Sequence, residues 1–296
     1  MSTTKRTFNI GEISYINCEI FNYPLEKLLL NKDLFSSLET ELEVNLVKDT
    51  PSKLNNLFMT GEIDLAPISA YAYLSMKDNC DLIKRVSISS FGAVKSVLFF
   101  SELSFQDLKK LQESEAKGNR KIDAQESLLE IFVSEESASS VALLKILLAE
   151  KYHLKINEIK FTQFTGTGLG LRNKLLIGDK ALKEDKNNYK YVYDLGLEWF
   201  EMTNGLPMVF GVWALKTAYF SKHQEIKTCV QDLIILAKTM GLNEDFNKIL
   251  EKVEKEKEIE KKILLEYYKS LNYDLTEDHL KALSLYENYL KKWELI

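Results

Sequence analysis

The sequence contains few of the residues that usually build disulfide frameworks, metal sites and phosphate-binding loops. It has three cysteines and three histidines in 296 residues. Cys18, Cys80 and Cys229 are odd in number and unrelated in spacing, which argues against disulfides and against a zinc site. No segment has the glycine spacing of a phosphate-binding loop. We therefore expect a protein that needs neither a metal nor a cofactor.

Long hydrophobic runs are also absent. No apolar stretch approaches the roughly 18 residues that a membrane-spanning helix needs. The N-terminal segment MSTTKRTFNIGEISYI passes directly from a short polar lead into a strand-like pattern. It lacks the apolar core and the small-residue cleavage site of a secretory leader. We therefore expect a cytoplasmic protein without a membrane partner.

The chain has no excess of basic residues. Its 39 lysines and arginines are opposed by 44 aspartates and glutamates, which gives a formal net charge of −5. The lysine-rich run EKVEKEKEIEKK alternates with glutamate at helical spacing, so it is expected to be the solvated face of a helix. Because nucleic acid binding needs a basic stripe, nucleic acid is not an expected partner.

The length of the chain and a repeated pattern point to two lobes. A chain of 296 residues exceeds the roughly 100 to 200 residues of one domain. Residues 87–101 and 191–215 each pair a glycine turn with an apolar run, and a strand-helix-strand block lies between them. We therefore predict that the chain leaves one lobe near Ser90 and returns near Gly205, with a hinge and a cleft. The expected lobes are residues 1–92 with 203–296, and residues 93–202.

Strand and helix signals alternate as far as residue 220, and only helical signals follow. The expected strands lie at residues 8–17, 42–50, 63–69, 94–100, 128–134 and 174–177. Three helical segments are expected after residue 222, with breaks near Gly241 and Asn272. The alternation predicts an α/β protein with a largely parallel sheet in each lobe.

Polar side chains follow several of the expected strands, where parallel sheets collect their ligands. They are Asn17, Ser69, Ser89, Ser137, Ser139, Ser140 and Asp179. Hydroxyls, an amide and helix N-termini suit an anionic ligand that is held by hydrogen bonds. Simpler roles stay open, because the serines fit helix capping, Asn17 fits a turn and Asp179 fits a cap. Gly205 needs no role beyond turning the chain.

Six segments between about residues 8 and 216 occur in the order and spacing of a known family. They are GEISYINC, KDTPSKLNNLFMTGEIDLAPIS, FGAVKSVLFFS, SASSVALLKILL, LIGDKAL and DLGLEWFEMTNGLPMVFGVWA. Together they resemble the chorismate dehydratases, which catalyse the first step of the futalosine route to menaquinone. The resemblance implies a two-lobed periplasmic-binding-protein type II-like fold with a hinged cleft, a helical C-terminal tail and a cytoplasmic location. It also implies a hydro-lyase that converts chorismate to 3-[(1-carboxyvinyl)oxy]benzoate.

The resemblance assigns roles to particular residues. The family's asparagine after the first strand falls on Asn17, and the serine of its crossing motif falls on Ser96, so these two are the catalytic candidates. A hydroxyl-rich turn of the family falls on residues 137–140, with Ala138 at the position of its arginine, so no guanidinium is expected there. The expected substrate contacts are Ser69, Ser89, Ser137, Ser139, Ser140, Asp179 and Gly205.

The matched segments contain no histidine or glutamate that is placed to remove the proton from C3 of the substrate. The substrate's own enolpyruvyl carboxylate is therefore the expected base. Two alternatives stay open: a non-catalytic cytoplasmic protein that binds a small anion, and the sister naphthoate-forming enzyme of the same route. The Ser/Pro/Asp-rich turn that tends to follow the first strand of that sister enzyme is missing here.

Overall fold

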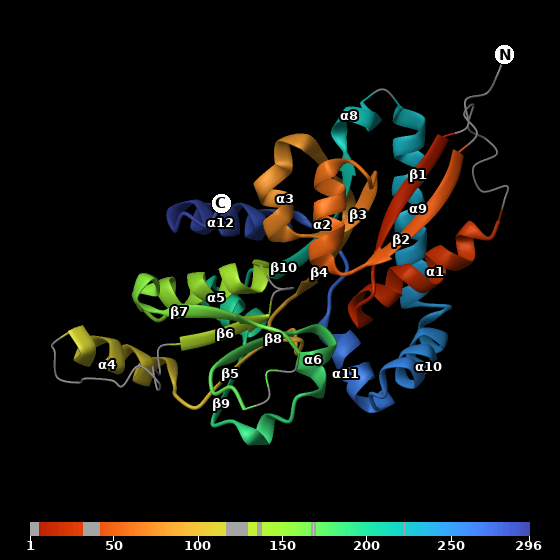
Figure 1. Cartoon of the computed structure of the whole chain (residues 1–296). Helices are drawn as coiled ribbons and strands as arrows, with labels where there is room; N and C mark the ends of the chain where they lie inside the picture. Colours follow the sequence, from red (N-terminus) through yellow and green to blue (C-terminus); the bar gives the residue numbers. More distant parts are fainter. Residues whose placement is uncertain are drawn as a thin grey trace, which may run out of the picture. The chain divides into compact units, whose positions relative to one another are not determined.

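The computed structural model describes residues 6–31, 42–116, 130–134, 138–166, 168, 170–221 and 223–296. The chain forms two compact units, Met1–Ser89 with Val209–Leu280, and Ser90–Met208 with Lys281–Ile296. It therefore passes between the units at three places, and Figure 1 shows the elements of each. The sequence-based division kept all C-terminal helices in the first lobe, whereas residues 281–296 group with the second unit.

The first unit is built on a five-stranded sheet in the order β2-β1-β3-β10-β4. Its strands are β1 (Arg6–Ile13), β2 (Leu42–Asp49), β3 (Leu65–Ser69), β4 (Cys80–Ser90) and β10 (Met208–Lys216). β1 is parallel to β2 and β3, so the carboxyl ends of these three strands share one edge. β10 runs antiparallel to β3, with Gly211 opposite Ser69.

Helices alternate with the strands of the first unit and follow them in the chain. They are η1 (Ile16–Cys18), α1 (Glu19–Leu29), α2 (Pro51–Thr60), α3 (Ala70–Met76), η2 (Lys77–Asn79), α8 (Thr217–Phe220), α9 (Gln224–Leu242), α10 (Phe246–Lys257), α11 (Lys261–Ser270) and the start of α12 (Glu277–Lys292). α2 begins at Pro51, where a missing N–H needs no partner, and ends at Gly61 with φ of 86°. Proline and glycine thus set both ends of this helix.

The lysine-rich run 251–262 is not one solvated helix. α10 ends at Lys257, Glu258 adopts a left-handed conformation with φ of 51°, and α11 begins at Lys261. The turn directs Ile259 inward, where only 5% of its surface is exposed. Burial of this one apolar side chain therefore interrupts a segment whose charge pattern favours a continuous helix.

α1 packs closely against α9 in the first unit. Gly241 makes this possible, because a Cβ atom at that position would lie 1.9 Å from the carbonyl oxygen of Ile20. The ring of Phe21, in α1, contacts the ring of Trp213 at 5.3 Å and the ring of Tyr273 at 5.7 Å between centroids. The start of α1 is thus fixed against both the sheet and the C-terminal segment.

The second unit has a five-stranded sheet in the order β7-β6-β8-β5-β9. Its strands are β5 (Val97–Ser101), β6 (Glu130–Ser134), β7 (Lys160–Phe164), β8 (Lys174–Ile177) and β9 (Tyr191–Asp194). β6 is parallel to β7 and β8, whereas β5 is antiparallel to β8 and β9. The expectation of largely parallel sheets is therefore wrong for β5 and β10. Each is the first strand after the chain passes from one unit to the other. β5 begins at the edge where β8 ends, and β10 begins at the edge where β3 ends.

The helices of the second unit enclose an apolar core. They are α4 (Phe105–Ala116), α5 (Ala138–Glu150), η3 (Ile156–Glu158), α6 (Gly178–Lys183), η4 (Lys186–Asn188), α7 (Leu195–Met202) and the remainder of α12. Tyr286 of α12 packs edge-on against Trp199 of α7 at 5.8 Å between centroids, and its hydroxyl donates to the carbonyl of Ser139. These contacts explain why the end of the chain belongs to this unit.

No helix within the described ranges is both long enough and apolar enough to cross a bilayer.

Candidate active site

Asn17 lies in η1, the short turn that follows β1. The turn is closed by the bond from the N–H of Cys18 to the carbonyl of Tyr15, at 2.9 Å. The Asn17 side chain is half-buried, and its oxygen Oδ1 is buried without a hydrogen-bond partner among the described residues. Because an unsatisfied buried acceptor costs about 1 to 3 kcal/mol, a donor from a bound ligand would be stabilised here.

Ser69 ends β3 at the same edge of the first sheet as the Asn17 turn. Its Oγ caps α3 by accepting from the N–H of Ala72 at 3.1 Å. The residue is half-buried, and its hydroxyl hydrogen can still donate to a ligand. The capping role and the proposed binding role are therefore compatible at this position.

Ser89 does not offer its hydroxyl to a ligand in this structure. The residue has no exposed surface. Its Oγ donates to the carbonyl of Asn272 at 3.0 Å and lies 3.0 Å from Nε2 of His279. This candidate is thus part of the internal packing of the first unit, a role that its position at a strand end did not reveal.

In the second unit, Ser96 stands at the start of β5 beside the end of β8. Its carbonyl accepts from the N–H of Gly178 at 2.8 Å. The preceding residue, Lys95, is in the left-handed region with φ of 64°. Only 3% of Ser96 is exposed, so a ligand that contacts its hydroxyl must reach into this edge of the sheet.

The segment before Ser96 is held by Asp194, which sequence reasoning did not single out. The Asp194 carboxylate accepts from the N–H groups of Val94 at 3.0 Å and Lys95 at 2.6 Å. It also caps α7 by accepting from Gly196 and Leu197. Burial raises the pKa of this carboxyl group, and the four N–H donors oppose that rise. Residues 91–96, which lie between β4 and β5, are called the crossing segment here. The Asp194 side chain therefore joins the crossing segment to the start of α7.

The close approach of the segment 90–92 to the start of α7 requires glycine at position 196. A Cβ atom there would lie 2.7 Å from the carbonyl oxygen of Gly92 and 2.8 Å from Oγ of Ser90. The available signal for this site was an aspartate directly between a strand and a helix, followed two residues later by glycine, in DLGLEW.

The serines expected after β6 are placed differently from one another. Ser137 lies outside the described residues. Ser139 is half-buried in the first turn of α5, whereas Ser140 is buried with 6% of its surface exposed. Asp179 is half-buried in the first turn of α6, directly after the glycine that bonds Ser96. β6, β8 and β5 therefore bring Ser139, Asp179 and Ser96 to one edge of this sheet.

Gly205 serves the backbone. Its φ is 103°, a conformation that favours glycine, and its N–H donates to the carbonyl of Phe200 at 2.9 Å after α7. These contacts account for the glycine without a ligand.

Two buried titratable groups have fixed partners. Nδ1 of His279 accepts from the N–H of Thr276 at 3.1 Å, so Nε2 carries the hydrogen that points to Ser89. Burial lowers the pKa of His279. Glu12 is paired with Lys48 at 2.7 Å, and burial raises its pKa. Neither group is placed as a solvent-accessible general base.

No group of three or more His, Cys, Asp and Glu side chains in the described part of the chain is arranged to hold a metal ion.

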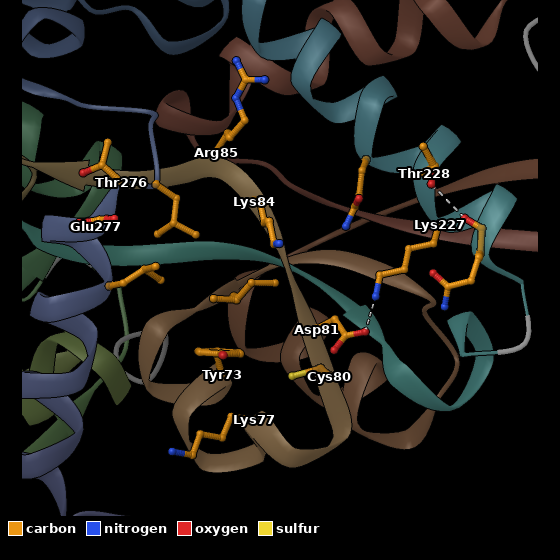
Figure 2. Close-up of a pocket in the computed structure, with 15 residues that line it drawn as sticks. Tyr73, Lys77, Cys80, Asp81, Lys84, Arg85, Lys227, Thr228, Thr276 and Glu277 are labelled. Carbon is orange, nitrogen blue, oxygen red and sulfur yellow. Dashed lines mark hydrogen bonds and ion pairs between the residues drawn. The ribbon is translucent and has the colours of Figure 1, made fainter.

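A cavity of about 830 Å³ lies in the first unit beside the start of β4. Figure 2 shows the pair between Lys227 and Asp81, at 2.7 Å, on its wall. Lys77, Lys84 and Glu277 also line it, so its walls carry both signs of charge. Burial raises the pKa of the Cys80 thiol to about 11, which makes it a poor nucleophile. None of the candidate catalytic or substrate-binding residues lines this cavity.

Known structures share the fold. Protein AF1704 from Archaeoglobus fulgidus superposes with a TM-score of 0.68 at 15% identity, over 98% of each chain. The periplasmic aliphatic sulphonate binding protein SsuA from Escherichia coli superposes with a TM-score of 0.63 at 11% identity, over 98% of this chain and 94% of that one. The expected α/β fold of the periplasmic-binding-protein type is confirmed, and at these identities the similarity concerns the fold alone.

Sequence relatives identify the family. A chorismate dehydratase from Thermus thermophilus is 30% identical in an alignment of 188 positions that covers 56% of this chain and 59% of that protein. The chain thus matches somewhat more than half the length of this curated relative. A family described as "Menaquinone biosynthesis" matches residues 8–292. Because that match extends over nearly the whole chain, the protein belongs to the menaquinone biosynthesis family.

Proposed function

We propose that the protein is a hydro-lyase that dehydrates chorismate to 3-[(1-carboxyvinyl)oxy]benzoate. The observation that carries this proposal is the 30% identity to a chorismate dehydratase, within a family that covers residues 8–292. The six segments on which the family resemblance rests include the asparagine turn after β1 and the serine before β5. The fold by itself supports a binding protein equally well, so the proposal depends on the sequence match and on these residues.

The reaction removes one molecule of water from the substrate. The proton on C3 and the hydroxyl group on C4 leave, a ring double bond forms, and the ring becomes aromatic. The enolpyruvyl ether stays attached to C3. No oxidant or reductant is consumed, so the protein must only bind the dianion, orient the ring and assist the two departures.

In this proposal Asn17 and Ser96 position the reacting groups. The buried Oδ1 of Asn17 supports its role, because it can accept a hydrogen bond from the substrate. The Ser96 hydroxyl can donate to the departing C4 oxygen. The enolpyruvyl carboxylate of the substrate removes the C3 proton, since His279 and Glu12 are both occupied by protein partners. Fixing an internal base beside its proton can remove about 7 to 11 kcal/mol of barrier.

Ser69, Ser139 and Asp179 are the proposed substrate contacts with partly exposed side chains. The two serines can donate to the substrate carboxylates. Asp179 is itself an anion, so it is better suited to accept from a substrate hydroxyl than to contact a carboxylate. We place the reaction in the cytoplasm and in the futalosine route as part of the same proposal.

The test is incubation of the purified protein with chorismate, without added cofactor, followed by separation of the products and mass analysis. We expect a benzoate product lighter than chorismate by one water molecule. Ser96→Ala serves as the matched variant, with an expected loss of at least about tenfold in kcat, because it removes a single oxygen atom. Saturable binding of chorismate without any conversion would refute the hydro-lyase and favour the binding-protein alternative.

A further inference from the structure

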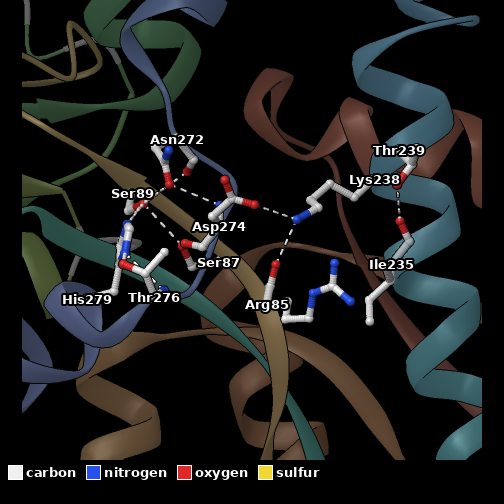
Figure 3. A network of polar contacts seen from close by, with 10 residues as sticks. All are labelled: Arg85, Ser87, Ser89, Ile235, Lys238, Thr239, Asn272, Asp274, Thr276 and His279. Atoms are coloured by element: carbon white, nitrogen blue, oxygen red, sulfur yellow. Dashed lines mark hydrogen bonds and ion pairs between the residues drawn. The ribbon is translucent and has the colours of Figure 1, made fainter.

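A short segment between α11 and α12 extends the first sheet beyond β4. Asn272 and Ser89 exchange backbone hydrogen bonds of 2.7 and 2.9 Å, and the N–H of Ser87 donates to Tyr273 at 3.0 Å. Figure 3 shows the segment beside β4, with His279 and Thr276 following it. The segment 272–274, which we call the C-terminal strap, therefore pairs with the outer edge of β4.

The C-terminal strap is also fixed from the side of α9. Lys238, of which 8% is exposed, donates to Oδ1 of Asp274 and to the carbonyl of Arg85, both at 2.7 Å. The side chain of Asn272 accepts from the N–H of Asp274 at 3.0 Å. Pairing on one side and a buried lysine on the other hold the strap in one position (Figure 3).

Tyr273 extends from the strap to the Asn17 turn. Its ring packs edge-on against Phe21, and only 3% of the residue is exposed. Its hydroxyl donates to the carbonyl of Asn17 at 3.0 Å. Tyr268 of α11 donates to the adjacent carbonyl of Ile16 at 2.8 Å. Two consecutive carbonyls of the turn are thus held by hydroxyls from the C-terminal part of the chain.

The turn itself is short. η1 contains three residues, the N–H of Cys18 donates to the carbonyl of Tyr15, and the N–H of Glu19 donates to the carbonyl of Ile16. The hydroxyl of Tyr273 therefore constrains the direction of the Asn17 peptide, and with it the direction of the Asn17 side chain.

We propose that Tyr273 is a positioning residue for Asn17, and that the C-terminal strap contributes to the reaction by holding Tyr273 in place. This inference deepens the proposed function, because it rests on the catalytic assignment of Asn17. A buried tyrosine needs some acceptor for its hydroxyl. What distinguishes Tyr273 is that its acceptor belongs to the residue proposed to contact the substrate.

The first test measures the turn without using the reaction. Tyr273→Phe keeps the ring and removes only the hydroxyl. We expect hydrogen exchange of a peptide spanning residues 15–19 to become about fivefold faster, the factor that corresponds to one ordinary hydrogen bond. Tyr189→Phe is the matched control, because it removes a hydroxyl that donates to Glu184 in the second unit. Unchanged exchange in Tyr273→Phe would overturn the proposal.

The second test is a double-mutant cycle with Asn17→Ala. In the otherwise unchanged protein, we expect Tyr273→Phe to lower kcat by about tenfold and to change KM much less, because the peptide of Asn17 is misplaced. In the Asn17→Ala background, the same change should have little further effect on kcat. Equal losses in both backgrounds would show that Tyr273 acts only on general stability and would refute its positioning role.

The two proposals fail in different ways. If the unaltered protein forms no aromatic product from chorismate, the proposed function is wrong. The hydrogen-exchange comparison then decides alone whether Tyr273 controls the turn. If the unaltered protein is active and Tyr273→Phe retains its full kcat, the function stands and the positioning role is wrong.

Discussion

Substitution of Asp194 should show how much of the second unit depends on one buried carboxylate. Asp194 accepts from four N–H groups, two in the crossing segment and two at the start of α7. Asp194→Ala removes all four bonds. Asp194→Ser restores the helix cap, because a serine oxygen can accept from Gly196 or Leu197, but it is too short to hold the crossing segment as well.

The two substitutions separate two contributions to the free energy of unfolding. Loss of a helix cap costs about 1 kcal/mol. Leaving the N–H groups of Val94 and Lys95 without their charged acceptor adds about 1.5 to 3 kcal/mol. We therefore expect Asp194→Ala to lower the free energy of unfolding by about 3 kcal/mol, and Asp194→Ser to recover about one third of that loss.

The assay is urea unfolding followed by tryptophan fluorescence and by circular dichroism, read where both probes report one transition. A second readout is kcat, which should fall in both variants because Lys95 immediately precedes Ser96. If Asp194→Ser restores the full stability, the bonds to the crossing segment contribute nothing measurable. If both variants retain full kcat, Asp194 does not position Ser96.

Four further predictions follow from individual sites. Asn17→Ala and Ser96→Ala should each lower kcat by at least about tenfold, or ~1.4 kcal/mol, with circular dichroism unchanged, and normal turnover in both would refute their assignment. Burial lowers the pKa of His279, so the unfolded chain binds the proton more strongly and the free energy of unfolding falls as the pH drops below about 6.5. Tm of His279→Gln should therefore depend less on pH than Tm of His223→Gln, which is a control at an exposed site. Gly241→Ala should separate α1 from α9 and lower Tm, because its Cβ would meet the carbonyl of Ile20. Exhaustive chelation should leave turnover unchanged, and recovery of lost turnover by one divalent ion would contradict the expected metal-free reaction.

Local elements were predictable from the sequence because their signals are carried by neighbouring residues. Pro51 and Gly61 bound α2 through backbone conformations that each residue favours by itself. The alternation of strands and helices was sufficient for the α/β class. The turn that carries Asn17 was placed after the first strand, and the structure has it in η1, after β1.

The direction of the strands and the burial of some candidates were not predictable in the same way. A pattern of apolar residues is identical in parallel and antiparallel strands, so β5 and β10 gave no sign of their reversal. Ser89 was expected at the crossing between the lobes, and its burial depends on Asn272 and His279, which lie more than 180 residues further along the chain.

The sequence by itself determined the class of fold, the bounds of α2 and the family, because these depend on the order of residues along the chain. Only the tertiary structure decided how Asn17 and Ser96 are supported. The hydroxyl of Tyr273 reaches Asn17 across 256 residues, and the carboxylate of Asp194 reaches Lys95 across 99. A hydrogen bond depends on a few ångströms in space, which a linear pattern of residues does not encode.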